Sequence, residues 1–211
     1  KSWGVWSWDK DNAYVQDGNL HIRMVYAPHK RDNMELFYKS GIISSRQKIA
    51  YGYFEARIKG ASKFPGVSPA FWMRSGHRDP GVAVKTEYSE VDFMELQQVE
   101  LKKVDCNLHA WRIVDGKLTK SSPRNSWIAP WDPREDYHIY ACETKPESIA
   151  WFVDGKKIAE VQDAKHWDLP MNVIFSMGLR RPLRIHGGSD GDHKVTFPNP
   201  EASTPEGFPT E

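Results

Sequence analysis

The sequence predicts an all-β fold of antiparallel strands, and three observations lead to it. Short runs that alternate polar and apolar residues recur along the chain, as expected for strands with one buried face. Asp-Gly pairs stand beside several of these runs and indicate two-residue hairpins. No stretch holds a helical period with caps, so helix content should be small. With 211 residues, the chain fits a single domain over residues 1–211.

The expected strands follow one another along most of the chain. Alternation predicts strands over residues 19–25, 51–58, 108–114, 137–142, 149–153, 156–161 and 171–179. Asp17-Gly18 precedes the first of them, Asp115-Gly116 ends another, and Asp154-Gly155 joins two as a hairpin. Residues 180–211 are rich in Pro, Gly, Ser and His and are expected to form a long loop.

Composition excludes some classes of partner. The formal net charge is +1 with no basic stripe, which argues against nucleic acid, and an acidic substrate would have to be recognised by local cations. No apolar run is long enough to span a membrane, and we expect a monomer. No cofactor is expected, and no ligand spacing indicates a structural calcium. Cys106 and Cys142 are either one disulfide or two buried thiols.

Three carboxylates stand close together in one expected strand, at Glu90, Asp92 and Glu95. Glu90 and Asp92 share a strand face, whereas Glu95 would fall on the opposite face by simple alternation. A β-bulge within Phe93-Met94 would bring Glu95 back, and bulges are frequent beside active sites. We therefore expect a row of three acids on one face.

Clustered acids are costly to build, since one of them must hold a proton at neutral pH. Retaining glycosidases need such a pair roughly 5–5.5 Å apart, one carboxylate attacking the sugar and the other group protonating the leaving oxygen. The alternatives are a solvated charged strand or a Ca²⁺ site. The aromatic content of 12%, with nine Trp, favours catalysis on a carbohydrate, because flat rings stack on sugar faces.

The carboxylate row resembles the signature of glycoside hydrolase family sixteen, E-x-D-x-E or its bulged form E-x-D-x-x-E. The bulged form stands here as Glu90-Val91-Asp92-Phe93-Met94-Glu95. Other segments are also similar to the family and most of all to its κ-carrageenases, at residues 4–8, 51–62, 64–73, 88–90, 132–134, 151–155, 170–173 and 178–180.

The resemblance implies a concanavalin-like fold, a two-sheet antiparallel jelly-roll sandwich with a concave substrate groove or tunnel. It implies hydrolysis of internal β-1,4 bonds of a sulfated galactan, a marine algal polysaccharide. We expect a bacterial enzyme that is secreted, or that lies in the periplasm or on the outer surface. Glu90 would be the nucleophile, Asp92 its helper and Glu95 the acid/base. Further implied or expected substrate contacts are Trp6, Trp72, Arg74, His109, Trp167 and Arg180. Arg180 would bind a sulfate group of the substrate.

Three departures from the family pattern leave alternatives open. The segment after Thr119 lacks an expected Trp-x-Arg and offers Lys120, Arg124 and Trp127, and Asp168 stands where a His is usual. The chain stops at Glu211 where family members continue, so one or both terminal strands are expected to be missing. An agarase or porphyranase is the alternative within the family, and a non-catalytic lectin-like jelly roll is the alternative from another class.

Overall fold

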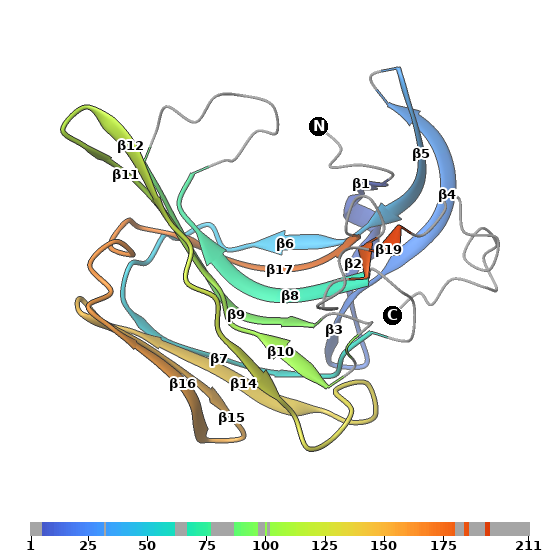
Figure 1. The fold of residues 1–211 in the computed structure, drawn as a ribbon. Helices are drawn as coiled ribbons and strands as arrows, with labels where there is room; N and C mark the ends of the chain where they lie inside the picture. Colours follow the sequence, from blue (N-terminus) through green and yellow to red (C-terminus); the bar gives the residue numbers. More distant parts are fainter. Residues whose placement is uncertain are drawn as a thin grey trace.

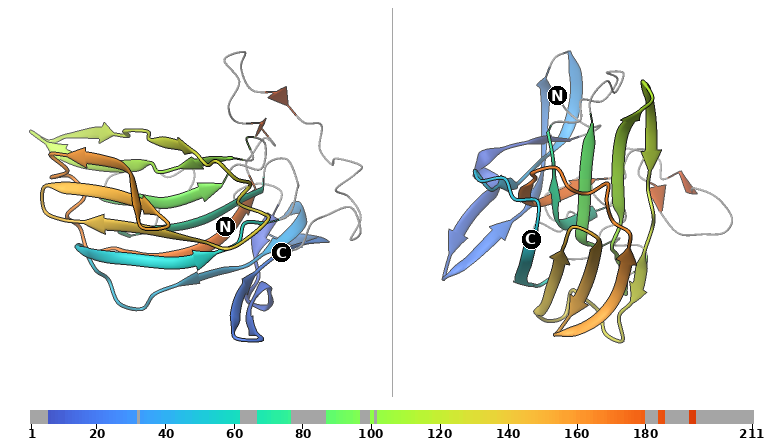
Figure 2. Two further views of the ribbon diagram at one scale, coloured as in Figure 1. Left: turned by 90° about the horizontal axis from the view of Figure 1, so that it is seen from below. Right: turned by 90° about the vertical axis from the view of Figure 1, so that its left-hand side faces the viewer.

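Two β-sheets packed face to face make up the centre of the computed structural model (Figure 1). It describes residues 6–31, 33–61, 67–76, 87–96, 100, 102–179, 184–185 and 193–194. The strands of the two sheets run in roughly the same direction, as in aligned sandwiches (Figure 2). The larger sheet is curved, and its concave face turns away from the smaller one (Figure 1).

The larger sheet has eight strands. Its main path runs β12 (Lys117–Ser121), β11 (Leu108–Val114), β9 (Tyr88–Leu96), β8 (Val67–Arg74), β17 (Asn172–Leu179) and β6 (Ile42–Ser44). Beside it, β9 pairs with β10 (Lys103–Asp105), which pairs with β13 (Ser126–Ile128). The smaller sheet runs β16 (Lys156–Gln162), β15 (Ser148–Val153), β14 (His138–Thr144) and β7 (Gly52–Ile58). β9 therefore lies inside the larger sheet, with neighbours on both edges.

Shorter elements complete the described part of the chain. A three-stranded sheet holds β1 (Trp6–Trp8), β5 (Met34–Ser40) and β4 (Met24–Arg31), and a hairpin joins β2 (Ala13–Gln16) to β3 (Asn19–Ile22). The described helix is one turn of 3₁₀ helix, η1 (Lys10–Asn12). The β4–β5 and β11–β12 hairpins project on opposite sides of the concave face (Figure 1). No described helix is long and apolar enough to cross a membrane.

Local turn chemistry confirms the predicted hairpins. Asp17-Gly18, Asp115-Gly116 and Asp154-Gly155 all have positive φ at both residues, from 49° to 77°. Asp and Gly tolerate that left-handed region, which two-residue hairpin turns require.

One strand prediction and one loop prediction need correction. The expected strand over residues 19–25 divides at Arg23, whose backbone N–H and side chain both bond to Asn12 instead of to a neighbouring strand. Within the expected loop over residues 180–211, β18 (Arg184–Ile185) and β19 (His193–Lys194) form a short antiparallel pair.

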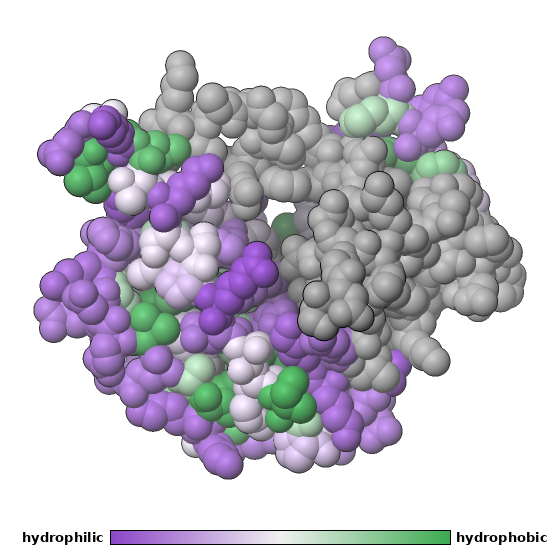
Figure 3. Space-filling view, in the orientation of Figure 1, coloured by the Kyte–Doolittle hydropathy of each residue, from purple (hydrophilic) through white to green (hydrophobic). Residues whose placement is uncertain are grey.

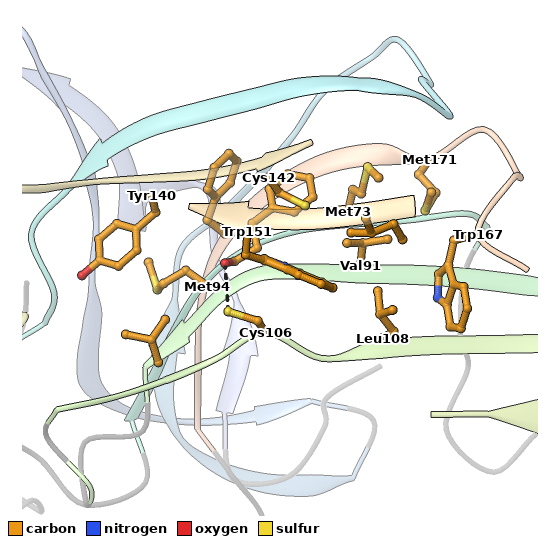
Figure 4. Packing of buried hydrophobic residues seen from close by; sticks show 14 of the residues in the cluster. Met73, Val91, Met94, Cys106, Leu108, Tyr140, Cys142, Trp151, Trp167 and Met171 are labelled. Carbon is orange, nitrogen blue, oxygen red and sulfur yellow. Dashed lines mark hydrogen bonds between the residues drawn. The ribbon is translucent and has the colours of Figure 1, made fainter. Parts of the chain in front are cut away.

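The main hydrophobic core lies between the two sheets (Figure 4). Trp151, from the smaller sheet, is fully buried, and its indole N–H donates to the backbone oxygen of Asp92 at 2.8 Å. This bond ties the carboxylate strand to the opposite sheet. Cys106 and Cys142 are both buried thiols, which resolves the two alternatives in favour of no disulfide. Burial raises the pKa of each thiol, so both should be unreactive.

Phe93→Ala is expected to destabilise the fold by about 3–5 kcal/mol, because it leaves a cavity in this core. Phe93 is 2% exposed and contacts rings of both sheets, with centroids 4.7 Å from Phe71 and 5.2 Å from Phe54. Urea unfolding measures the loss. The control is Ile113→Ala at a side chain that is 49% exposed, for which about 0.5 kcal/mol or less is expected. Equal losses in the two variants would contradict the packing described.

An ion pair in the segment before β14, between Asp132 and Arg134, makes a pH-dependent contribution to the free energy of unfolding. The Arg134 guanidinium bonds both oxygens of Asp132, and this hydrogen bonding lowers the pKa of that carboxyl. A folded-state pKa below the unfolded value contributes stability above the unfolded pKa, which is lost as the pH falls through the folded one.

Asp132→Asn should therefore cost on the order of 0.5–1 kcal/mol at pH 7, and the difference from the parent should shrink below about pH 4. Urea unfolding at pH 7 and at pH 3 checks this expectation. Asp163→Asn, at a side chain 78% exposed, is the control with no expected loss. A penalty for Asp132→Asn that is the same at both pH values would refute the charge-based explanation.

Candidate active site

A β-bulge in β9 brings the three acids to one face. Across the β8–β9 ladder, Arg74 lies opposite Glu90 and Trp72 opposite Asp92, and the register then shifts. Phe71 lies opposite Met94 and Ala70 opposite Glu95, so Phe93 has no opposite residue on β8.

The bulge lets Phe93 and Met94 both enter the core, where they are 2% and 1% exposed. Glu95 consequently returns to the face of Glu90 and Asp92, as predicted. This face is the concave one, because the intervening residues of β9 pack into the core between the sheets (Figures 1 and 4).

Glu90 is surrounded by polar groups from three strands. Arg74 of β8 and His109 of β11 lie opposite it on the two neighbouring strands. The Tyr88 hydroxyl donates a hydrogen bond to Glu90 Oε2. His109 Nε2 lies 3.8 Å from Glu90 Oε1 and 3.9 Å from Asp92 Oδ2, and its Nδ1 lies 3.0 Å from Ser122 Oγ. Arg74, His109 and the Tyr88 hydroxyl thus give Glu90 potential hydrogen-bond donors from three strands.

Glu95 has different neighbours. Asn107 donates its amide N–H to Glu95 Oε2 at 3.2 Å, and Asp105 of β10 lies directly opposite Glu95. Burial raises the pKa of Asp105, the Lys103 ammonium at 3.5 Å opposes this effect, and the Glu95 carboxylate adds to it. Glu90 and Glu95 thus have different surroundings: Glu90 lies beside a guanidinium, an imidazole and a hydroxyl, and Glu95 beside an amide and a second carboxyl group.

Ligand atoms of Glu90, Asp92 and His109 lie within 4.8 Å of one another, so these three residues could hold a metal ion. Two carboxylates and one imidazole in this arrangement serve proton transfer equally well. The acid/base steps expected from the carboxylate row would be carried by carboxyl groups and need no metal.

Three predicted substrate contacts lie on the face of the acids. Trp72 is half-buried beside Asp92, its indole N–H donates to Ser176 Oγ at 3.1 Å, and Arg74 Cζ lies 5.3 Å from its ring centroid. Arg74 and His109 flank Glu90 as described above. Their contact with substrate stays a prediction. Arg180 lies outside the described residues.

Two other predicted contacts are wrong. Trp6 is 5% exposed and packs in a second core cluster with Met24, Tyr38 and Met177. Trp167 is 4% exposed and lies beside Leu108 in the main core, with its indole N–H bonded to the His109 backbone oxygen at 3.1 Å (Figure 4). Rings enclosed by protein have no face left for a sugar. Trp167 therefore packs against β11 from the core side, and Trp6 lies in the second cluster.

Tyr88 and Asn107 were missed as site residues. Tyr88 lies two positions before Glu90, so strand alternation alone places it on the same face. No comparable signal was present for Asn107, because its position opposite the end of β9 depends on how β10 and β11 pair with that strand.

A separate cleft of about 480 Å³ lies between β3, β7 and β17. None of the three acids is among its lining residues. The side of the molecule that carries the β11–β12 hairpin is largely hydrophilic, with apolar side chains exposed at the hairpin tip at Ile113, Val114 and Leu118 (Figure 3).

Comparisons with known proteins identify the family of the chain. The family model for glycosyl hydrolases family 16 matches residues 2–187. A kappa-carrageenase of Pseudoalteromonas carrageenovora is 37% identical over 230 aligned positions that cover all of this chain and 56% of that protein. This chain thus spans little more than half the length of that relative. A beta-porphyranase B of Zobellia galactanivorans is 26% identical over 89% of this chain and 69% of that protein.

Solved structures show the same fold. The complex of the kappa-carrageenase from P. carrageenovora with an oligotetrasaccharide of kappa-carrageenan superposes with a TM-score of 0.81 at 35% identity, covering 100% of this chain and 82% of that one. A kappa-carrageenase from Z. galactanivorans gives 0.76 at 33% identity, covering 100% and 81%. These neighbours confirm the predicted jelly-roll sandwich. With its family model matched over most of its length, the chain belongs to the glycosyl hydrolases of family 16.

Proposed function

We propose that this chain is an endo-acting, retaining glycoside hydrolase that cleaves internal β-1,4 linkages of a sulfated galactan of the κ-carrageenan or furcellaran type. The observation that carries the chemistry is the bulge in β9, which places Glu90, Asp92 and Glu95 on one face. Identities of 33–37% with kappa-carrageenases over the whole chain support the substrate class.

In this mechanism, Glu95 donates its proton to the glycosidic oxygen while a Glu90 oxygen attacks the anomeric carbon. The bond from that carbon to the leaving oxygen breaks, and a glycosyl ester to Glu90 forms. Glu95, now ionised, takes a proton from water, and the resulting attack releases the sugar and restores the Glu90 carboxylate. Asp92 is nearly buried beside Glu90 and His109 and would tune the ionisation of the nucleophile.

Arginines beside the three acids would bind the sulfate groups of the substrate. The guanidinium fork suits the oxygens of a sulfate ester, and Arg74 stands opposite Glu90 on the concave face. Arg180 remains the residue that the family resemblance assigns to a sulfate next to the cleavage point. Because a long polysaccharide cannot enter a cell intact, we also propose that the protein acts outside the cytoplasm.

The test is to incubate the protein separately with κ-carrageenan, furcellaran, porphyran and agarose, and to measure reducing ends and product sizes. Even-numbered sulfated oligosaccharides released from κ-carrageenan or furcellaran would support the proposal. Activity on porphyran or agarose alone would keep the catalytic assignment and overturn the substrate. Binding without hydrolysis of any of them would favour the lectin-like alternative.

A further inference from the structure

The Tyr88 hydroxyl is hydrogen-bonded to Glu90, the proposed nucleophile, and the Tyr88 ring belongs to a stack of side chains. It lies two residues before Glu90 on the same face of β9, is 3% exposed, and donates its hydroxyl proton to Glu90 Oε2. Its ring stacks on Trp111, the residue opposite it on β11, with centroids 4.5 Å apart and planes 23° apart. On the next strand, Lys120 Nζ lies 5.6 Å from the Trp111 ring centroid.

This stack restricts the phenol to one position. Trp111 is 5% exposed and lies between Tyr88 and Lys120 in a row that crosses β9, β11 and β12. Burial first, and then the charge of Glu90, raise the pKa of Tyr88 far above its ordinary value. The hydroxyl therefore remains a proton donor throughout the pH range in which a glycosidase works.

We propose that Tyr88 is a positioning residue for the nucleophile. A hydrogen bond to one carboxylate oxygen fixes the rotation of the carboxylate plane, and thereby the direction in which the other oxygen meets the anomeric carbon. A misplacement of about 1 Å at a reacting atom can cost about 10²-fold in rate, so this orientation matters for turnover.

The same bond acts in both halves of the reaction. When Glu90 forms the glycosyl ester, its negative charge passes to the departing sugar oxygen, which receives the Glu95 proton, and Tyr88 stays bonded to the ester carbonyl oxygen. When water attacks, the ester bond breaks and the charge returns to the Glu90 carboxylate, where a fixed donor stabilises it. The inference rests on the retaining chemistry proposed above and is independent of which galactan is cleaved.

Other charged or titratable groups also face Glu90. They are Asp92 on β9 itself, Arg74 on β8 and His109 on β11. Tyr88 differs from these groups because it is a neutral donor at working pH. Its removal changes hydrogen bonding to the nucleophile without removing a charge from the site.

Tyr88→Phe is the test, since it keeps the ring and its stacking while deleting the donor. We expect kcat to fall about 10- to 100-fold with KM changed less than about threefold. The acidic limb of the kcat/KM profile, which reports ionisation of the nucleophile, should move upward by roughly 0.5–1 pH unit. Trp111→Phe keeps the hydroxyl but weakens the stack, so it should give an intermediate loss.

Tyr140→Phe is the matched control. The Tyr140 hydroxyl is also buried, and it finds no hydrogen-bond partner among the described residues. Parental kcat and an unmoved pH profile are expected for it. Thermal unfolding verifies that each variant is folded.

A second readout requires no substrate. Carboxyl ¹³C NMR of protein labelled at Glu, with the Glu90 signal assigned by Glu90→Gln, follows the ionisation of the nucleophile directly. An upward shift of that titration in Tyr88→Phe would support the inference even if the parent protein cleaved none of the four polysaccharides, an outcome that would overturn the proposed function alone. An unmoved Glu90 titration, or a kcat within twofold of the parent, would overturn the role of Tyr88.

Discussion

Glu90→Gln is expected to abolish hydrolysis while leaving polysaccharide binding intact. The amide oxygen keeps the shape of the side chain and still accepts the Tyr88 hydroxyl hydrogen bond, but an amide cannot form the glycosyl ester. Loss of a nucleophile lowers kcat by about 10⁴-fold or more. Reducing-end release measures the activity, and affinity electrophoresis in gels containing the polysaccharide measures the binding.

The same pair of measurements separates the enzyme from a lectin. Arg74→Gln is the comparison variant, because it changes the opposite residue on β8 and leaves all three acids in place. It should weaken binding and retain measurable turnover. If Glu90→Gln hydrolysed the polysaccharide at the parental rate, the assignment of the nucleophile would be wrong.

Glu95→Ala should lose about 10²–10⁴-fold in activity on the polysaccharide, because protonation of the leaving oxygen is removed. The loss should be much smaller on an oligosaccharide with an activated aryl leaving group, which departs without a proton. With that substrate, the glycosyl ester to Glu90 still forms but water attacks it slowly. Added azide should then restore turnover and give a glycosyl azide of retained configuration, identified by NMR.

The configuration of the azide product distinguishes the two carboxyl groups. Azide added to Glu90→Ala would attack the substrate itself and give a glycosyl azide of inverted configuration, because this variant forms no ester intermediate. A retained azide from Glu95→Ala together with an inverted one from Glu90→Ala would support both roles. The reverse pattern would exchange the nucleophile and the acid/base.

Much of this site could be predicted from local sequence because its causes are local. Hairpin turns at Asp-Gly pairs follow from the tolerance of these residues for positive φ, and their positive φ angles confirm it. The bulge in β9 followed from counting: three acids can share a face only if one residue of Phe93-Met94 is unpaired, and Phe93 is that residue.

What the sequence by itself determined was the all-β class, the hairpins and the row of acids, because strand period and turn geometry act over a few neighbouring residues. Only the tertiary structure decided that Trp6 and Trp167 are enclosed while Trp72 lies on the face of the acids. It also decided that the cysteines are separate thiols and that Trp111 stacks on Tyr88. Those outcomes depend on strand order and register between segments far apart in the chain. An alternating pattern shows that a strand has one buried face and one open face. It does not show which other segment of the chain will cover the buried face.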